Sequence, residues 1–232
     1  MTGRTLGEEL ERAGPGFKQD VVRSIAKPIY PQGGIAVLRG NLAPSGAIIK
    51  QSAADAQLME HEGRAVVFEN LVDLALRIDS DELDANADDV LVLKHIGPKG
   101  APGMPEAGYL PIPRKLARPG VKDMLRISDG RMSGTAFGTI VLHVTPESAI
   151  GGPLAQVRNG DRIRLSVQRR EISLLVSDEE LAQRMHDKPV VEPTATRGYR
   201  KLFLQSMLQA DQGVDFDFLQ AAQMTGKVSA QR

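Results

Sequence analysis

Cysteine and tryptophan are absent from the 232-residue sequence, and aromatic residues make up only 4% of it. Without cysteine the chain can form no disulfide, use no thiol nucleophile and offer no thiolate to an iron–sulfur cluster. Only four histidines occur, at widely separated positions, which excludes a zinc site of the HExxH type. Any chemistry in this chain therefore rests on carboxylates, hydroxyls, lysines and backbone groups.

Net charge and long apolar runs are also lacking. Lysine plus arginine equals aspartate plus glutamate, at 29 each, so no global field attracts nucleic acid or an anionic membrane. No apolar run approaches the roughly 20 residues of a membrane span, and the N-terminal residues lack the apolar core of a signal peptide. We expect a cytoplasmic globular protein that binds neither nucleic acid nor membrane.

Short apolar runs broken by glycine and proline predict a strand-rich domain with few helices. Strands are expected at 35–39, 47–50, 65–68, 90–94, 139–144, 161–167 and 171–176, and helices at 6–13, 71–77, 113–118, 177–185 and 197–209. Residues 40–46 are predicted to form an exposed loop, and the chain from Gln212 onward a loosely docked or frayed tail. The pattern favours a mixed α/β domain built on a curved sheet or barrel.

Residues 126–138 form a glycine-rich loop between two apolar runs, and Ser133 lies between glycines within it. Glycine lets the backbone adopt positive φ or approach a ligand closely. Small hydroxyl side chains such as Ser128, Ser133 and Thr135, together with unpaired amides, suit an anionic substrate. The same composition also fits a turn-rich connection with incidental serines.

A second irregular loop, rich in glycine and proline, occupies residues 95–108 after the apolar run 90–94. Its spacing does not match a P-loop. Glu106, near its end, is a carboxylate that a stiff loop holds close to the end of a strand, which suits a hard cation such as Mg²⁺. The alternative is a first-turn glutamate that interacts with a helix dipole.

Five motifs, in order over about residues 2–185, resemble the dihydroxy-acid and sugar-acid dehydratase family. They are GGIAVLRGNLAP at 33–44, GPKGAPGMPE at 97–106, SDGRMSG at 128–134, HVTPE at 143–147, and GGP followed by NGD within 151–161. The resemblance covers the family's C-terminal part, and residues 2–6 resemble a segment inside the family's chain.

This resemblance implies an α/β fold, a swivelling β/β/α domain similar to the mobile domain of aconitase, with a β-barrel-like mixed sheet flanked by helices. Residues 1–188 would form this domain, and residues 189–232 a helical extension and tail packed on it. A larger N-terminal domain of the same protein would carry the cysteines for an iron–sulfur cluster, with 2Fe–2S favoured over 4Fe–4S, and the other ligands of a shared Mg²⁺. The family is typically a homodimer or homotetramer.

The activity implied is that of a hydro-lyase, which dehydrates a 2,3-dihydroxy sugar acid to a 2-keto-3-deoxy acid. The resemblance assigns Ser133 as the catalytic base and Glu106 as the ligand that this chain gives to Mg²⁺. A free serine hydroxyl is a very poor base, so Ser133 needs a nearby cation and a dry site. The isolated chain is expected to be an inactive half of the catalytic site.

Four further residues are secondary candidates. Thr135 and the amides around Gly134 are placed to bind the substrate carboxylate. Arg39 and Asn41 either line the cleft or buttress the domain interface.

Residues 109–113 and 131–138 look more like the pentonate and hexonate dehydratases, of the arabinonate type, than like the dihydroxy-acid dehydratase of branched-chain amino-acid biosynthesis. That second enzyme is the alternative substrate class. A non-catalytic, stand-alone binding or interaction domain is a further alternative. Intact Ser133 and Glu106 argue against it, because a non-catalytic descendant need not keep either residue.

Overall fold

The structure, a computed structural model, describes residues 2–14, 16, 19–104, 110–132, 137–187 and 194–220. It divides into two compact units, Met1–Gly33 and Gly34–Arg232. The first unit contains the helix α1 (Leu6–Ala13), which has the predicted bounds and begins with a capping box between Thr5 and Glu8.

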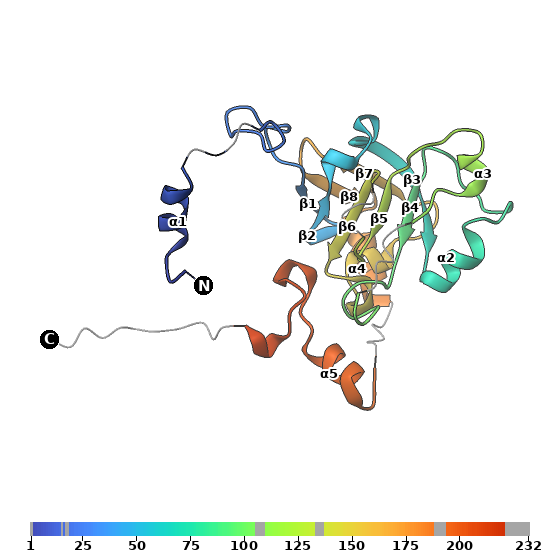
Figure 1. Ribbon diagram of the computed structural model, residues 1–232. Coiled ribbons are helices and arrows are strands. Elements are labelled where there is room, and N and C mark those ends of the chain that lie inside the picture. The colour runs from blue at the N-terminus through green and yellow to red at the C-terminus, as the bar shows by residue number, and fades with distance from the viewer. Residues whose placement is uncertain are drawn as a thin grey trace. The chain divides into compact units, whose positions relative to one another are not determined.

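Eight strands of the second unit close into a barrel in the order β1–β2–β6–β5–β4–β3–β7–β8 (Figure 1). The strands are β1 (Ala36–Gly40), β2 (Ala43–Ile49), β3 (Glu60–Phe68), β4 (Val90–Leu93), β5 (Arg126–Ser128), β6 (Ile140–Thr145), β7 (Arg162–Ser166) and β8 (Glu171–Leu174). Strands β3, β4, β5 and β6 pair in parallel, and β1 pairs in parallel with β8. The other pairs are antiparallel. The expectation of a mixed α/β fold on a barrel is confirmed.

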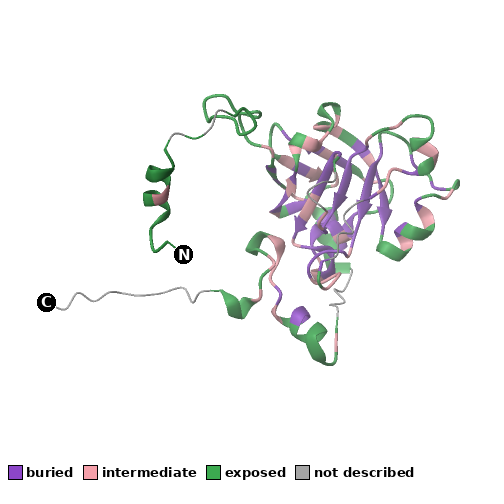
Figure 2. Ribbon diagram, in the orientation of Figure 1, coloured by how far each residue is buried: buried purple, intermediate pink, exposed green. Residues whose placement is uncertain are grey.

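The central parallel strands β4 and β5 are buried on both faces (Figure 2). Side chains along β3 alternate between two hydrophobic clusters, as the period of a strand requires. Ala65 and Val67 join a cluster that draws on all eight strands and fills the barrel. Val66 and Phe68 join a second cluster on the outer face, together with Leu74 of helix α2. Parallel strands with two buried faces are the expected outcome for continuous apolar runs.

Among its described residues, the second unit has the α-helices α2 (Leu71–Arg77), α3 (Arg114–Ala117), α4 (Asp178–Asp187) and α5 (Gly198–Ser206). Asn70 caps α2 by accepting hydrogen bonds from the backbone N of Val72 at 2.9 Å and of Asp73 at 3.0 Å, and the helix has its predicted bounds. Among the described residues, no helix combines the length and the apolar character that a membrane crossing requires.

The connection between β1 and β2 differs from the prediction. An exposed loop was expected over 40–46, but β2 already begins at Ala43, which pairs with Gly40 across a tight turn. Leu42 and Ala43 are fully buried in the barrel. Proline and glycine in 44–46 imitate a loop, and the register of the barrel overrides that local signal.

The C-terminal segment is also more ordered than predicted, because residues 212–220 fold back on α5. Met207 pairs with Phe216, whose ring packs edge-on against Phe203 with centroids 5.9 Å apart. In and directly after α5, the apolar residues Phe203, Leu204 and Met207 are buried, whereas Leu202 is exposed. Residues 221–232 lie outside the described part of the chain.

Helix α4 is fastened to the barrel by a buried ion pair, which gives a test of the fold. Arg184 donates to both oxygens of Asp161, at 2.6 and 3.0 Å, and to the Gln156 carbonyl at 3.1 Å. Arg184→Ala leaves the Asp161 carboxylate without its cation, so we expect the free energy of unfolding to fall by about 3 kcal/mol. Urea denaturation measures this change.

The control is Arg169→Ala, which removes an exposed pair with Glu171 at 3.6 Å. We expect it to cost less than about 1 kcal/mol. Equal effects of the two variants would contradict the buried role of Arg184.

Candidate active site

The four parallel strands end at one edge of the sheet, and a charged residue follows each end directly or within two residues. These residues are Glu69 after β3, Lys94 after β4, Asp129 after β5 and Glu147 after β6. Parallel sheets and barrels bind their ligands outside the carboxyl ends of the strands. This edge is therefore the candidate site.

Asp129 joins two of the connections at this edge. Asp129 is 1% exposed. Its Oδ1 accepts from the Ile96 backbone N at 3.0 Å, and its Oδ2 accepts from the Ser148 backbone N at 2.8 Å. Burial raises the pKa of Asp129, and the two amide hydrogen bonds oppose that rise. The carboxylate thus ties the loop after β4 to the turn after β6.

Glu147 makes a second set of such links. Its carboxylate accepts from the backbone N of Lys99 at 2.9 and 3.0 Å and of Gly100 at 2.9 Å. The side chain of Gln209 donates to it at 2.7 Å. Burial is the main cause that raises the pKa of Glu147, and the nearby charge of Asp129 adds to it. Glu147 therefore holds the glycine-rich loop 97–104 and the C-terminal segment together.

Lys94 is fully buried at the end of β4. Its Nζ donates to Glu69 Oε1 at 2.9 Å and to the Ala155 carbonyl at 3.1 Å. The Glu69 side chain is 53% exposed, so this pair connects a buried ammonium with the surface. Such a pair compensates the cost of burying the lysine charge.

Two glycines allow the loops at this edge to pass close to their neighbours. A Cβ atom on Gly97 would lie 2.6 Å from Glu147 Oε2, and one on Gly130 would collide with the side chain of Ile96. A larger residue at either position would displace the contacts that order the edge.

The predicted site residues Glu106, Ser133, Gly134 and Thr135 lie outside the described residues. The structure does bring together the two loops in which they occur. Arg131 Nε, two residues before Ser133, donates to the carbonyl of Met104, two residues before Glu106, at 2.6 Å. The loops leave neighbouring parallel strands at the same edge.

Arg39 lines a cavity of about 240 Å³ at the end of β6, together with His143, Thr145 and Asp211. Its Nη1 donates to the Ser45 carbonyl at 3.0 Å. Burial, and to a lesser degree the charge of Arg131, lower the pKa of His143. The backbone N of His143 donates to the Gly130 carbonyl at 3.1 Å, so the cavity borders the loop that leads to Ser133.

Asn41 has a different position. Its Nδ2 donates to the Leu174 carbonyl and its Oδ1 accepts from the Leu174 backbone N, both at 2.8 Å. This pair of hydrogen bonds fastens the β1–β2 turn to β8. The geometry favours a buttress over a residue that lines the cleft.

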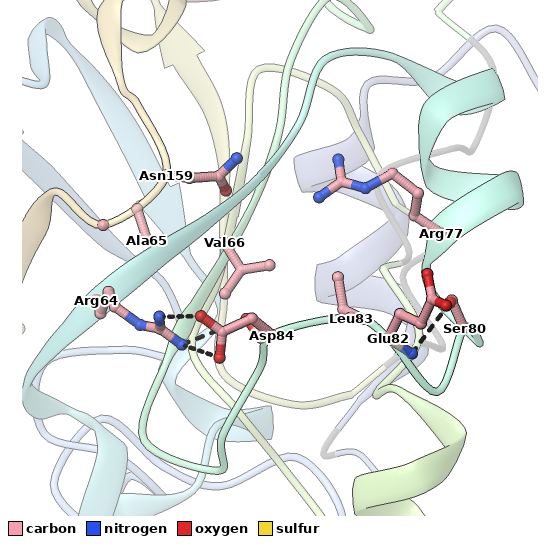
Figure 3. Close-up of a pocket in the computed structure, with 10 residues that line it drawn as sticks. Arg64, Ala65, Val66, Arg77, Ser80, Glu82, Leu83, Asp84 and Asn159 are labelled. Carbon is pink, nitrogen blue, oxygen red and sulfur yellow. Dashed lines mark hydrogen bonds and ion pairs between the residues drawn. The ribbon is translucent and has the colours of Figure 1, made fainter.

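A larger cavity of about 500 Å³ lies beside β3 and the segment after α2 (Figure 3). Two arginines contribute to its walls, and each is engaged by acidic residues. Arg64 pairs with Asp84 and with Asp89, at 2.8 Å to the latter, and Arg77 pairs with Asp73 at 2.9 Å. Because these charges are compensated within the fold and none of the four charged residues at the strand ends lines the cavity, we do not assign it as the active site.

No cluster of three or more histidine, cysteine, aspartate or glutamate side chains in the described part of the chain could hold a metal ion. Both oxygens of Asp129 and of Glu147 already accept amide hydrogen bonds. The donor set of this chain thus fits a magnesium ion only if Glu106 is joined by ligands from elsewhere. With no cysteine in the sequence, cluster thiolates would also come from elsewhere.

Sequence reasoning assigned no role to Lys94, Asp129, Glu147 or Gln209. For the first three a signal existed, because each is a charged residue that follows an apolar run at or within two residues of its end. For Gln209 there was none, since its position depends on how residues 207–216 fold back.

The family model described as dihydroxy-acid/6-phosphogluconate dehydratase C-terminal matches residues 20–214. A protein of Rhizobium meliloti (strain 1021) that is named as a dehydratase is 56% identical over 203 residues, which are 88% of this chain and 35% of that protein.

Two further relatives carry more specific names. The L-arabonate dehydratase of Azospirillum brasilense is 49% identical over 228 residues, covering 94% of this chain and 38% of its own length. The 6-deoxy-6-sulfo-D-gluconate dehydratase of Pseudomonas putida is 49% identical over 225 residues, covering 96% and 39%. A dihydroxy-acid dehydratase of Dehalococcoides mccartyi (strain CBDB1) is less similar, at 38% identity. The chain spans little more than a third of the length of these relatives.

The role of Asn41 can be tested by Asn41→Ala. The variant leaves both backbone groups of the buried Leu174 without their partners, so we expect the free energy of unfolding to fall by about 1–3 kcal/mol. Urea denaturation measures this loss, with Gln168→Ala in an exposed turn as the control. Unchanged stability of Asn41→Ala would contradict the buttress role.

The environment of His143 gives a prediction in pH. Because the pKa of His143 is lowered from 6.5, the NMR chemical shifts of its ring protons should change with pH with a midpoint below 6.5. The unfolded chain binds this proton more readily than the folded chain does. The stability that His143 contributes is therefore present above the pKa of the unfolded state and is lost as the pH falls through the pKa of the folded state. Arg131→Gln should raise the midpoint only in part, since burial is the larger cause. A wild-type midpoint of 6.5 or above would refute this prediction.

Proposed function

The chain belongs to the dihydroxy-acid/6-phosphogluconate dehydratase C-terminal family, and we propose that it is the C-terminal part of a hydro-lyase that acts on a sugar acid. The observation that carries this proposal is the 49% identity, over 94–96% of the chain, to relatives named for L-arabonate and for 6-deoxy-6-sulfo-D-gluconate. The reaction is the loss of water from a 2,3-dihydroxy acid, which gives an enol that tautomerises to the 2-keto-3-deoxy acid.

Ser133 is the proposed base for the proton on C2. A serine hydroxyl acts as a base only where its alkoxide is stabilised and water is excluded. The hydrogen bond between Arg131 and Met104 supports this assignment, because it joins the two loops at positions two residues before Ser133 and two residues before Glu106. The buried carboxylates of Asp129 and Glu147 anchor the described parts of this edge.

Glu106 is the residue of this chain that would hold Mg²⁺. Magnesium and an iron–sulfur cluster, when bound, supply Lewis-acid polarisation of the carboxylate and hydroxyl oxygens of the substrate. The cluster would be ligated by cysteines of an N-terminal domain, with 2Fe–2S favoured over 4Fe–4S. A carboxylate from a loop at a strand end is an appropriate ligand for a hard cation that retains other oxygen ligands.

The remaining candidates have supporting roles. Thr135 and the amides around Gly134 are proposed to bind the substrate carboxylate. Arg39 is proposed to line the cleft, because its cavity borders the loop that leads to Ser133. Asn41 is proposed to stabilise the barrel.

The rest of the active site belongs to the portion of the relatives that this chain does not match. The relatives named above are matched over 35–39% of their length. We propose that an N-terminal domain of the same protein completes the site, that the protein acts as a homodimer or homotetramer, and that the isolated chain is inactive.

The test is turnover of a panel of aldonic acids by the full-length protein, with a branched-chain dihydroxy acid as the competing substrate class. We expect an aldonic acid to be preferred and the isolated chain to convert none. Preference for the branched-chain acid would favour the alternative enzyme. Full-length protein that converts no acid would favour a non-catalytic binding domain.

The base assignment is tested by Ser133→Ala in the full-length protein. Loss of a general base lowers kcat by about 10²–10⁴-fold. The visible absorption of the cluster should be unchanged, because the 232-residue C-terminal part that carries Ser133 contains no cysteine. Ser24→Ala, at an exposed position, is the control. Retained turnover by Ser133→Ala would reject Ser133 as the base.

A further inference from the structure

Glu147 and Gln209 form two hydrogen bonds with one another, one in each direction. Gln209 Nε2 donates to Glu147 Oε1 at 2.7 Å, and the Glu147 backbone N donates to Gln209 Oε1 at 3.0 Å. Each end of the Gln209 amide therefore faces a group of the opposite kind, which fixes its orientation. One side chain thus joins the C-terminal segment to the turn after β6.

The Glu147 carboxylate also contacts the loop after β4. Its oxygens also accept from the backbone N of Lys99 and of Gly100. From Gly100 the loop runs to Met104, whose carbonyl is held by Arg131. The stretch that leads to Glu106 is therefore anchored at both ends, and one of the two anchors is Glu147.

Gln209 is presented by a folded segment. Leu208 N donates to the Asp215 carbonyl at 2.9 Å, and Val214 N donates to the Gln209 carbonyl at 3.2 Å. The pairing of Met207 with Phe216 closes the same turn. Because hydrogen bonds within the segment also hold this turn, the contact restrains the loop at a lower cost in conformational entropy than a free tail would.

We propose that Glu147 and Gln209 are positioning residues through which the C-terminal segment, residues 198–220, sets the position of the loop that leads to Glu106. The effect on the loop stands on the structure alone. Its consequence for magnesium rests on the proposed function, in which Glu106 is the metal ligand.

Exchange of the two side chains gives a sharp test. Gln209→Glu sets a second carboxylate against Glu147 Oε1, and Glu147→Gln sets an NH₂ group against the NH₂ group of Gln209. In the double variant Glu147→Gln/Gln209→Glu, the new amide donates to the new carboxylate, and its oxygen still accepts from Gly100. The single variants should therefore be defective, and the double variant should recover.

The first readout is hydrogen exchange of residues 97–104 in the full-length protein. Loss of a hydrogen bond to a charged group should speed exchange in each single variant by about tenfold or more. The double variant should return to within about twofold of the wild type, because the two changes are coupled. Gln205→Glu, which adds the same charge at an exposed position on α5, is the matched control and should have no effect.

The second readout is the Mg²⁺ concentration at half-maximal turnover. It should rise in the single variants and recover in the double variant, while kcat at saturating Mg²⁺ changes little. A role in global stability alone would not shift the Mg²⁺ dependence in this way. Gln209→Leu removes both hydrogen bonds without a charge, and should give the same loop-specific exchange even if a charged variant does not fold.

The two readouts separate the two hypotheses. Unchanged exchange in the single variants, or no recovery in the double variant, would overturn the positioning role even in an active enzyme. The expected exchange pattern in a full-length protein that dehydrates no acid would instead reject the proposed function and leave the link between the segment and the loop established.

Discussion

Two buried carboxylates organise the edge at which the parallel strands end. Asp129 and Glu147 are each 1% exposed, and both are held by backbone N–H groups of neighbouring connections. Burial of a carboxylate costs free energy unless its oxygens are hydrogen-bonded, so each group can remain charged only while those connections keep their positions. The geometry of the edge and the charge of its carboxylates thus depend on one another.

The barrel explains why polar groups gather there. Side chains of β4, and of β3 from Ala65 onward, belong to two hydrophobic clusters, one inside the barrel and one outside. Along these strands no face remains for chemistry, and the first positions open to charged residues lie beyond their ends. Irregular loops that leave such an edge need anchors other than apolar packing, and carboxylate–amide hydrogen bonds provide them.

What the sequence could predict was local. Helices 6–13 and 71–77 were predicted with their observed bounds, because a capping residue next to an amphipathic turn fixes a helix start without tertiary help. The turn at 41–42 and the fold-back of residues 212–220 were missed, since barrel register and the packing of Phe216 decide them.

For the candidate site, too, the sequence could predict residues within motifs but not contacts between distant parts of the chain. Motif resemblance singled out Ser133 and Glu106, which lie outside the described residues and stay predictions. The partners of Asp129, Glu147 and Gln209 are backbone groups far away in the chain, and no sequence pattern announces such contacts.

The barrel closes between β1 and β8, and this seam adjoins the cavity near the strand ends. In the described residues, β1 meets β8 through the pairing of Arg39 with Glu171, helped by the bond from Arg39 N to the Arg170 carbonyl at 2.9 Å. The two hydrogen bonds between Asn41 and Leu174 are the further fastening of the β1–β2 turn to β8. Arg39 belongs both to this seam and to the cavity wall. Through Arg39, the closure of the barrel is thus coupled to the shape of the cavity beside His143.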